Sequence, residues 1–309
     1  TSLPDPVDMV VVAIPAVLVP GVIEEAGRAG ARVAVILSAG FREAGEEGAR
    51  LEEALLANAE RAGIRVVGPN CLGIMLPPYR INTTFDPVSP RAGTIAFISQ
   101  SGAVITMVVD WSLPEEIGFS VVISVGNQAD LKIVDFIESF ADDARIDTIC
   151  GYIEDIKDSR AFLRALKRIT PKKPVIILKG GVTGEGAEAA ASHTGAMAGD
   201  YSIWSAVMRQ HRCIEVHTER QMVDVVMLAV SERIPAGPRV GYLGAGGGTS
   251  VLFTDLAASA GFSLPELSRK TQESIGGTIP DVNTSTRNPV DLGAAGFDLR
   301  IVTHAMREM

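Results

Sequence analysis

The chain has 309 residues, of which 47% are hydrophobic and 21% are charged, and its formal net charge is −9. The length favours two or three α/β units over a single core, and the negative charge argues against nucleic acid as the main partner. No apolar run has the length of a membrane span, and the three cysteines show no C-x-x-C spacing. We therefore expect a cytoplasmic protein with no disulfide framework.

Residues 1–90 alternate short apolar runs with amphipathic segments. Near-continuous Val and Ile runs indicate strands covered on both faces, which favours a parallel sheet. The pattern predicts strands over 7–14, 32–37 and 64–67, and helices over 16–30 and 46–62. This unit is predicted to be Rossmann-like, and it lacks an opening strand.

A proline-rich passage over residues 77–90 is predicted to connect this unit to a second domain. The same alternation then restarts, which predicts a flavodoxin-like, doubly wound parallel sheet over residues 91–235. The expected strands cover 94–98, 119–124, 147–153 and 174–179. One helix is expected to begin at Gly102, and four more are expected over 131–141, 160–169, 201–210 and 218–231.

Residues 236–309 open a third α/β unit after a second linker at 234–238. "RVGYLGAGGG" predicts a strand and a glycine-rich turn, followed by a helix over 250–260. The unit ends inside a predicted helix, so we expect it to be incomplete. "GAGGGT" departs from G-x-G-x-x-G at Thr249, and the chain has no P-loop motif, so a nucleoside triphosphate pocket is expected outside this segment.

Polar residues follow the strands of the second unit at the edge where ligands bind in parallel sheets. Ser99–Gly102 runs directly into a helix and forms a candidate anion cradle of amide groups and hydroxyls. Glu154 follows the strand over 147–153, and Lys179-Gly180-Gly181 leads towards His193. Taken singly, Ser99–Gly102 is also explained as a helix cap, and Glu154 as a solvated residue at a strand end.

His193 lies in "AASHTGAMAGD", where small neighbours would leave an imidazole accessible in a flexible loop. A neutral imidazole is a nucleophile, and a carboxylate bonded to its other nitrogen would fix the tautomer and support the cation. We therefore favour a functional His193 that receives a phosphoryl group, with the cradle around its oxygens. His211, His217 and His304 are expected to be structural, and "HRCIEVH" matches no closed zinc spacing, so no metal site is predicted.

Five motifs in fixed order carry a family resemblance over essentially the whole chain. They are "GPNCLG" (68–73), "FISQSGA" (97–103), "SVGNQAD" (124–130), "YIEDIKD" (152–158) and "SHTGAMAG" (192–199). "NPVDLG" (288–293) fits the same pattern. The chain resembles the NDP-forming acyl-CoA synthetases, relatives of the succinyl-CoA synthetase α subunit.

The resemblance implies a CoA-binding domain over 1–90, a ligase domain with the phosphohistidine loop over 91–235, and an incomplete third ligase subdomain over 236–309. It also implies a reversible reaction in which acid, CoA and NTP give acyl-CoA, NDP and phosphate through an acyl phosphate. His193 matches the phosphorylated histidine and Glu154 the carboxylate that supports it. The matched phosphate-binding residues are Ser99, Gln100, Ser101 and Gly102. The matched CoA-binding residues are Pro15, Ser38, Ala39, Gly40, Asn70 and Cys71.

The chain also departs from the family pattern. The glycine-rich turn that holds the nucleotide end of CoA is missing, and so is the ATP-grasp portion that would bind ATP or ADP with Mg²⁺. The implied partners are a small carboxylic acid, CoA, and an ATP-grasp domain or β-type subunit in an oligomer. Two alternatives stay open: a CoA-sensing module, against which the retained His193 and Glu154 argue, and a lyase that passes through an acyl-CoA intermediate. The sequence leaves the acyl group and the choice of ATP or GTP undetermined.

Overall fold

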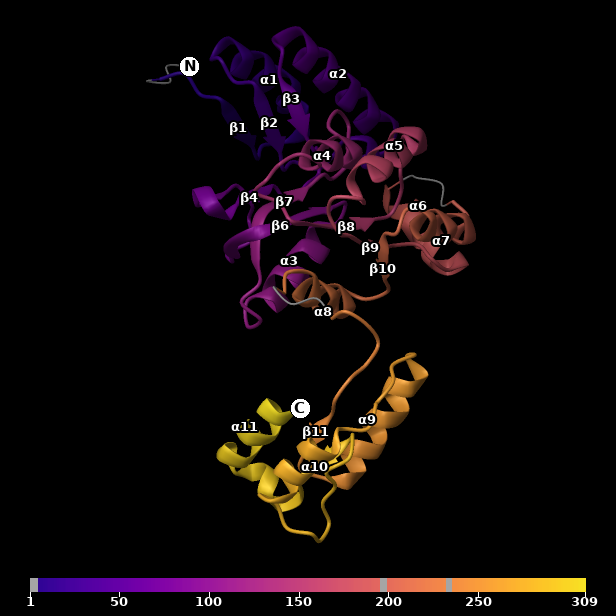
Figure 1. Ribbon diagram of the computed structural model, residues 1–309. Helices are drawn as coiled ribbons and strands as arrows, with labels where there is room; N and C mark the ends of the chain where they lie inside the picture. Colours follow the sequence, from indigo (N-terminus) through magenta and orange to yellow (C-terminus); the bar gives the residue numbers. More distant parts are fainter. Residues whose placement is uncertain (1–4, 195–198, 232–234) are drawn as a thin grey trace. The chain divides into compact units, whose positions relative to one another are not determined.

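The computed structural model describes residues 5–194, 199–231 and 235–309, with side chains described up to residue 190 in the first range (Figure 1). Helices and strands alternate along the chain, which confirms the predicted α/β class. The chain divides into two compact units, Thr1–Glu232 and Arg233–Met309.

The first sheet of the larger unit has three parallel strands, β1 (Met9–Val12), β2 (Val33–Ile36) and β3 (Arg65–Val67), in that order. Helices α1 (Val19–Arg28) and α2 (Glu46–Ala62) pack together and bury Ile23 and Leu55. The expected first helix over 16–30 begins instead with a 3-10 turn, Ala16–Leu18. The α-helix starts at Val19 because Pro20, which has no amide hydrogen, fits only the first turn.

The second sheet has seven strands in the order β10-β9-β8-β6-β7-β4-β5. Five of them are parallel: β6 (Arg91–Ser99), β7 (Gly118–Ser124), β8 (Thr148–Ile153), β9 (Val175–Lys179) and β10 (Ile214–Val216). The passage 77–90, predicted as a connection, contains one short strand of this sheet, β5 (Ile81–Asn82), which forms its edge. β5 pairs antiparallel with β4 (Ile74–Leu76), a strand that the sequence did not predict, and β4 pairs antiparallel with β7; the turn at Pro77–Tyr79 joins the two short strands.

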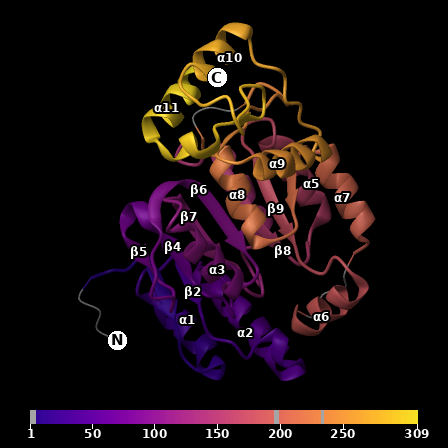
Figure 2. The same cartoon turned by 90° about the horizontal axis from the view of Figure 1, so that it is seen from below.

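Two helical layers cover the second sheet (Figures 1 and 2). α3 (Gly102–Ser112) and α8 (Glu219–Ala229) lie on one face. On the other face lie α4 (Ile133–Phe140), α5 (Ser159–Ile169) and α7 (Tyr201–Gln210). Residues of β9 alternate strictly, with Val175 and Ile177 in one core cluster and Ile176 and Leu178 in the other. Both faces of β9 are therefore buried, which explains why its sequence is a continuous apolar run.

Helix α6 spans Gly184–Thr194, so the backbone at residue 193 is helical where the sequence analysis expected a loop. The small residues that suggested flexibility include alanines, which have the highest helix propensity. Thr183 caps the first turn, since the amide of Gly186 donates to its Oγ1 at 3.0 Å. The His193 side chain lies outside the described residues, as do residues 195–198 of the same motif.

A hydrogen-bonded joint holds the carboxyl ends of the two sheets together. The Asn127 amide donates to the Pro69 carbonyl at 2.9 Å, and the Ala129 amide donates to that of Gly68 at 3.1 Å. Gly126 has φ 50°, and a Cβ placed there would collide with the Pro69 carbonyl oxygen. Only glycine allows the two chain segments to approach this closely.

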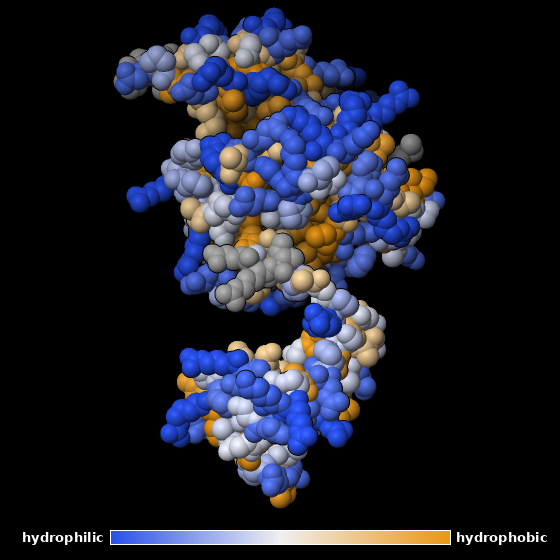
Figure 3. Space-filling model, in the orientation of Figure 1, coloured by the Kyte–Doolittle hydropathy of each residue, from blue (hydrophilic) through white to orange (hydrophobic). Residues whose placement is uncertain are grey.

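The smaller unit is built on two short parallel strands, β11 (Leu243–Gly244) and β12 (Val290–Asp291). Its helices are α9 (Gly247–Ser259), α10 (Arg269–Gly276) and α11 (Leu299–Glu308). They enclose a small core that contains Ile275, Val290, Leu292 and Ala305. In the space-filling view, hydrophilic residues cover much of the visible face of both units (Figure 3). Within the described ranges, no helix has both the length and the apolar character to cross a membrane.

The joint provides a stability test. We expect Gly126→Ala to lower the free energy of unfolding by about 1–3 kcal/mol, because the added methyl group must displace the Pro69–Asn70 backbone. Gly21→Ala is the control: Gly21 lies inside α1, where an added methyl group would meet open space, so this change should be neutral or stabilise by up to about 1 kcal/mol. Urea denaturation measures both, and equal stabilities for the two variants would contradict the assigned joint.

Candidate functional site

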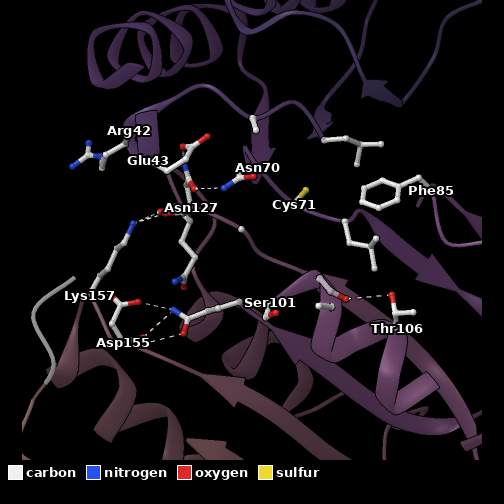
Figure 4. A pocket seen from close by; sticks show the side chains of 18 residues that line it. Arg42, Glu43, Asn70, Cys71, Phe85, Ser101, Thr106, Asn127, Asp155 and Lys157 are labelled. Atoms are coloured by element: carbon white, nitrogen blue, oxygen red, sulfur yellow. Dashed lines mark hydrogen bonds between the residues drawn. The ribbon is translucent and has the colours of Figure 1, made fainter. Parts of the chain in front are cut away.

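A pocket of about 720 Å³ lies where the carboxyl ends of the two sheets meet (Figure 4). The loops after β2, β3, β6, β7 and β8 contribute to its lining. In Figure 4, Phe85 and Thr106 lie to one side of Cys71, while Glu43, Asn127 and Lys157 lie to the other. The pocket therefore has a less polar end and a charged end, and the thiol of Cys71 lies between them.

The Ser99–Gly102 turn begins helix α3 at the pocket wall. Ser101 is the N-cap, and its Oγ accepts from the Val104 amide at 3.4 Å. Ser99 is fully buried, and its hydroxyl accepts from the Ser101 amide at 3.0 Å and donates to the Ser101 carbonyl at 2.7 Å. Ser101 and Gly102 thus line the pocket, while Ser99 shapes the turn from behind.

Gln100 links this turn to the carboxylate loop after β8. Its Nε2 donates to the Asp155 carbonyl at 3.0 Å and to Asp155 Oδ1 at 2.7 Å. Its Oε1 accepts from the amides of Glu154 and Asp155, the latter at 3.1 Å. Gln100 was predicted to bind phosphate. Its hydrogen bonds to residues 154 and 155, called the Gln100 latch below, were not predicted, because no sequence signal pairs Gln100 with Asp155.

Glu154 is half-buried at the end of β8 and has one satisfied and one unsatisfied oxygen. Its Oε1 accepts from the Tyr152 hydroxyl at 3.1 Å. Its Oε2 is buried and, among the described residues, has no hydrogen-bond partner. A buried carboxylate oxygen without a donor costs free energy, so a hydrogen-bond donor that reached this atom would stabilise it.

The surroundings of Glu154 restrict how it can move. Burial raises the pKa of Tyr152, and the negative charge of Glu154 raises it further, so the phenol stays a hydrogen-bond donor. Gly180 leaves room for both groups, because a Cβ there would lie 2.5 Å from the Tyr152 hydroxyl and 3.2 Å from Glu154 Cγ. Tyr152 and Gly180 therefore confine the carboxylate.

Lys179, predicted to end the strand over 174–179 but given no role of its own, lies against the same loop. Its Nζ donates to the Glu154 carbonyl at 2.7 Å and also to the Gly180 carbonyl, and it lies 5.6 Å from the centre of the Trp204 ring. Burial lowers the pKa of Lys179, although the negative charges of Glu154 and Asp155 oppose this shift. Lys179 thus ties the end of β8 to the segment that leads into α6.

The residues predicted to bind CoA lie along adjacent strand ends of the first sheet. Ala39, Asn70 and Cys71 line the main pocket, while Pro15 and Ser38 line a second pocket of about 410 Å³. Gly40, with φ 105°, lines neither pocket, and its amide donates to Glu43 Oε1 at 2.6 Å.

Asn70 has the left-handed φ of 55°, and its amide donates to the Ser38 carbonyl at 2.9 Å. Ser38 in turn bonds both the amide and the carbonyl of Ile14, at 3.0 and 2.5 Å. The three strand-end loops of the first sheet are therefore linked by hydrogen bonds, and together they form one continuous wall that borders both pockets.

Cys71 is buried, and its Sγ lies 3.3 Å from the carbonyl oxygen of Ile36. Burial raises the pKa of the thiol to about 12, so almost no thiolate exists near neutral pH. Cys71 is therefore a small packed residue, and its thiol is not activated as a nucleophile. All three cysteines, Cys71, Cys150 and Cys213, are unpaired.

A polar cluster that the sequence analysis did not identify closes the charged end of the pocket. Asn127 Nδ2 donates to Glu43 and, at 3.1 Å, to Glu52, while its Oδ1 accepts from Asn70 at 3.3 Å. Arg42 pairs with Glu52 at 2.9 Å. Burial acts to raise the pKa of Glu43, but hydrogen bonds from Asn127 and from backbone amides outweigh it and lower the pKa.

The described residues contain no group of three or more His, Cys, Asp or Glu side chains placed to hold a metal ion. Lys157 supplies a cation at the charged end, where its Nζ donates to the carbonyls of Asn127 and Gln128. Among the described residues that line the pocket, the cationic side chains are Arg42 and Lys157.

Two family models match the chain in the expected order. Residues 1–77 match a CoA binding domain, and residues 92–229 match a succinyl-CoA ligase like flavodoxin domain. Together the two matches include the first sheet and most of the second.

Curated relatives and a solved structure extend the match along the chain. The chain is 39% identical to the alpha subunit of an ADP-forming acetate–CoA ligase I from Pyrococcus furiosus, over 94% of this chain and 63% of the relative. It is 41% identical to an ADP-forming acetate–CoA ligase I from Archaeoglobus fulgidus, over 94% of this chain and 42% of the relative. A structure of acetyl-coenzyme A synthetase 1 from Ca. Korarchaeum cryptofilum, in complex with phosphate and ADP, has a TM-score of 0.84 at 37% identity, over 94% of this chain and 63% of that one.

The fold and the pocket define an α/β protein in which a CoA-binding domain is joined to a ligase-type flavodoxin domain. The chain belongs to the NDP-forming acyl-CoA synthetases and corresponds to their alpha-type portion. It spans about 40 to 65% of the length of the curated relatives reported above.

The buried thiol gives a pH-dependent prediction. With a pKa of about 12, Cys71 carries a thiolate fraction of about 10⁻⁴ at pH 8, so we expect iodoacetamide to label it at least about a hundredfold more slowly in the native state than after unfolding. Labelling should accelerate as the pH rises towards 12, as long as the fold persists. Peptide mass spectrometry measures the rate, and rapid labelling of native Cys71 at pH 8 would contradict the assignment.

Proposed function

We propose that this chain is the phosphoryl-relay and CoA-binding portion of an enzyme that joins a small carboxylic acid to CoA. The enzyme would convert acid, CoA and NTP to acyl-CoA, NDP and phosphate, reversibly. One observation carries the proposal: Glu154 Oε2 is buried without a partner among the described residues, and the Glu154 side chain lies beside Gly180, in the segment that leads to His193. A histidine N–H would satisfy this oxygen.

In the proposed reaction the neutral imidazole of His193 attacks the γ-phosphorus of the NTP, and NDP leaves. Glu154 would accept the hydrogen bond from the other ring nitrogen and stabilise the cationic phosphohistidine. A carboxylate oxygen of the acid then attacks this phosphorus and releases the histidine, which gives an acyl phosphate. The CoA thiol, after losing its proton, attacks the acyl carbon, and inorganic phosphate leaves.

The Ser101–Gly102 turn supports the phosphate-binding role. It brings the start of α3 to the pocket, where free amides and the helix dipole favour a phosphoryl group. Gln100 would act as a positioning residue, since its latch to Asp155 keeps the turn and the carboxylate loop at a fixed separation. The positions of both groups are thus set before any substrate binds.

CoA would lie along the loops after β1, β2 and β3, with its thiol end at Asn70 and Cys71. The two pockets support this path, because they follow these loops and share Leu37 and Phe85. The nucleotide and Mg²⁺ would be bound mainly by an ATP-grasp domain or β-type subunit, in an oligomer in the cytoplasm. The relatives reported above are named ligases or synthetases, which favours this reaction over a sensing module or a lyase.

The reaction class is tested by product analysis with the complete enzyme. Acid, CoA and Mg-ATP or Mg-GTP should give acyl-CoA together with NDP and phosphate in equal amounts. Formation of AMP and pyrophosphate, or tight CoA binding without turnover of any acid, would contradict the proposal.

Glu154 is tested by Glu154→Gln, which keeps the size of the side chain and removes its charge. We expect the rate of enzyme phosphorylation by NTP to fall about a hundredfold or more, with the dissociation constant of CoA changed less than about twofold. Glu47→Gln, a matched change on the exposed face of α2, should affect neither quantity. Rapid-quench labelling and calorimetry give the two values, and equal losses in phosphorylation and CoA binding would contradict the role of Glu154.

A further inference from the structure

Phe85 is the exposed aromatic residue of the pocket. Its side chain is 75% exposed, although exposed aromatic surface is unfavourable in water. Figure 4 shows its ring at the less polar end of the pocket, on the side of Cys71 away from Glu43 and Asn127. A large, exposed apolar side chain that lines a pocket is typical of a ligand-binding site.

The chain on either side of Phe85 is firmly held. Thr83 makes three hydrogen bonds to Ile74, in which its amide and hydroxyl donate to the Ile74 carbonyl and its Oγ1 accepts from the Ile74 amide, all at 2.9–3.0 Å. Asp86 is buried, its amide donates to Thr84 Oγ1 at 3.1 Å, and its Oδ1 accepts from the Val88 amide at 2.9 Å. The exposure of Phe85 is thus a property of an ordered turn.

Phe85 also borders two pockets at once. The main pocket at Asn70 and Cys71 and the second pocket at Pro15 and Ser38 share two lining residues, Leu37 and Phe85. A ligand that occupies both pockets would therefore lie against Leu37 and Phe85. A compact acid would fit into one pocket, whereas an extended ligand is needed to span two.

We propose that Phe85 binds the pantetheine arm of CoA where the arm crosses from the second pocket into the main one. This inference rests on the proposed function, which places the thiol end of CoA at Asn70 and Cys71. The arm is narrow and carries methyl groups and amides, so it can pack against an aromatic face that a charged phosphate would avoid. Phe85 contacts the arm and lies away from the reacting bond.

A contact of Phe85 with the arm, away from the reacting bond, predicts that substitutions of Phe85 change the KM of CoA and not kcat. The ring contacts the arm equally in the ground state and in the transition state, so it contributes uniform binding. We expect Phe85→Ala to raise the dissociation constant and KM of CoA at least tenfold and to change kcat less than twofold. Phe85→Leu, which keeps apolar bulk, should recover part of the loss. Because Phe85 is exposed, neither variant should unfold the protein, and thermal melting checks this.

Truncated ligands locate the contact on CoA. Calorimetry with the complete protein compares CoA with its nucleotide end alone, 3′-phospho-ADP, which lacks the arm. Phe85→Ala should weaken CoA at least tenfold and leave 3′-phospho-ADP unchanged. Phe262→Ala is the matched control, since Phe262 is 45% exposed and lines neither of these two pockets. It should not change either affinity.

Three outcomes overturn the inference. They are an unchanged CoA affinity in Phe85→Ala, an equal loss for CoA and 3′-phospho-ADP, and a change in selectivity among carboxylic acids with CoA affinity intact, which would assign the ring to the acid. The binding assay needs no turnover, so it separates the two proposals. If CoA binding depends on Phe85 but no acyl-CoA forms, the proposed function fails and this inference stands.

Discussion

The pocket at the carboxyl ends of the two sheets depends on the hydrogen-bonded joint between the loop after β7 and the loop after β3. Backbone hydrogen bonds from Asn127 and Ala129 to Pro69 and Gly68 link the two sheets through the loops at the carboxyl ends of β7 and β3. Gly126 permits the close approach, and the Asn127 side chain extends the joint to Glu43 and Glu52. The strand-end loops proposed to bind CoA and the Ser101–Gly102 turn proposed to bind phosphate consequently border the same pocket.

The carboxylate loop is positioned from several sides within that frame. Gln100 fixes its backbone, Lys179 holds the Glu154 carbonyl, and Tyr152 occupies one carboxylate oxygen. The remaining oxygen stays buried and available. Such fixed polar groups can stabilise a developing charge without rearrangement, which is the usual source of electrostatic catalysis in enzymes.

Sequence patterns predicted the parts of the fold that depend on local periodicity. The Val and Ile runs located the parallel strands, and Ser101-Gly102 located the start of α3. The predictions were incomplete or wrong where long-range strand pairing or helix propensity decided the outcome. β4 joins the second sheet through long-range pairing with β7, which no local signal reveals, and the small residues before His193 form a helix where a loop was expected.

The candidate site was predictable to a similar degree. Glu154, Ser101 and Asn70 stand at strand ends, where parallel topology brings polar residues together. Gln100 as a latch and Asn127 as a bridge depend on contacts between residues 55 to 84 positions apart. Phe85 as an exposed ring depends on a turn held by its own side chains. Single-sequence reasoning cannot detect such contacts, because the residues involved follow no periodicity.

The most direct measurement of the central claim is to locate the phosphoryl group. The complete protein is incubated with Mg-ATP labelled at the γ-phosphate and digested at alkaline pH, and the labelled peptide is identified. Phosphorylation of His193 predicts a label on the peptide that contains His193, stable in base and lost at low pH. The label should be absent from His193→Ala, and it should be discharged when the carboxylic acid substrate and CoA are added. A label on another residue, or one that persists in His193→Ala, would contradict it.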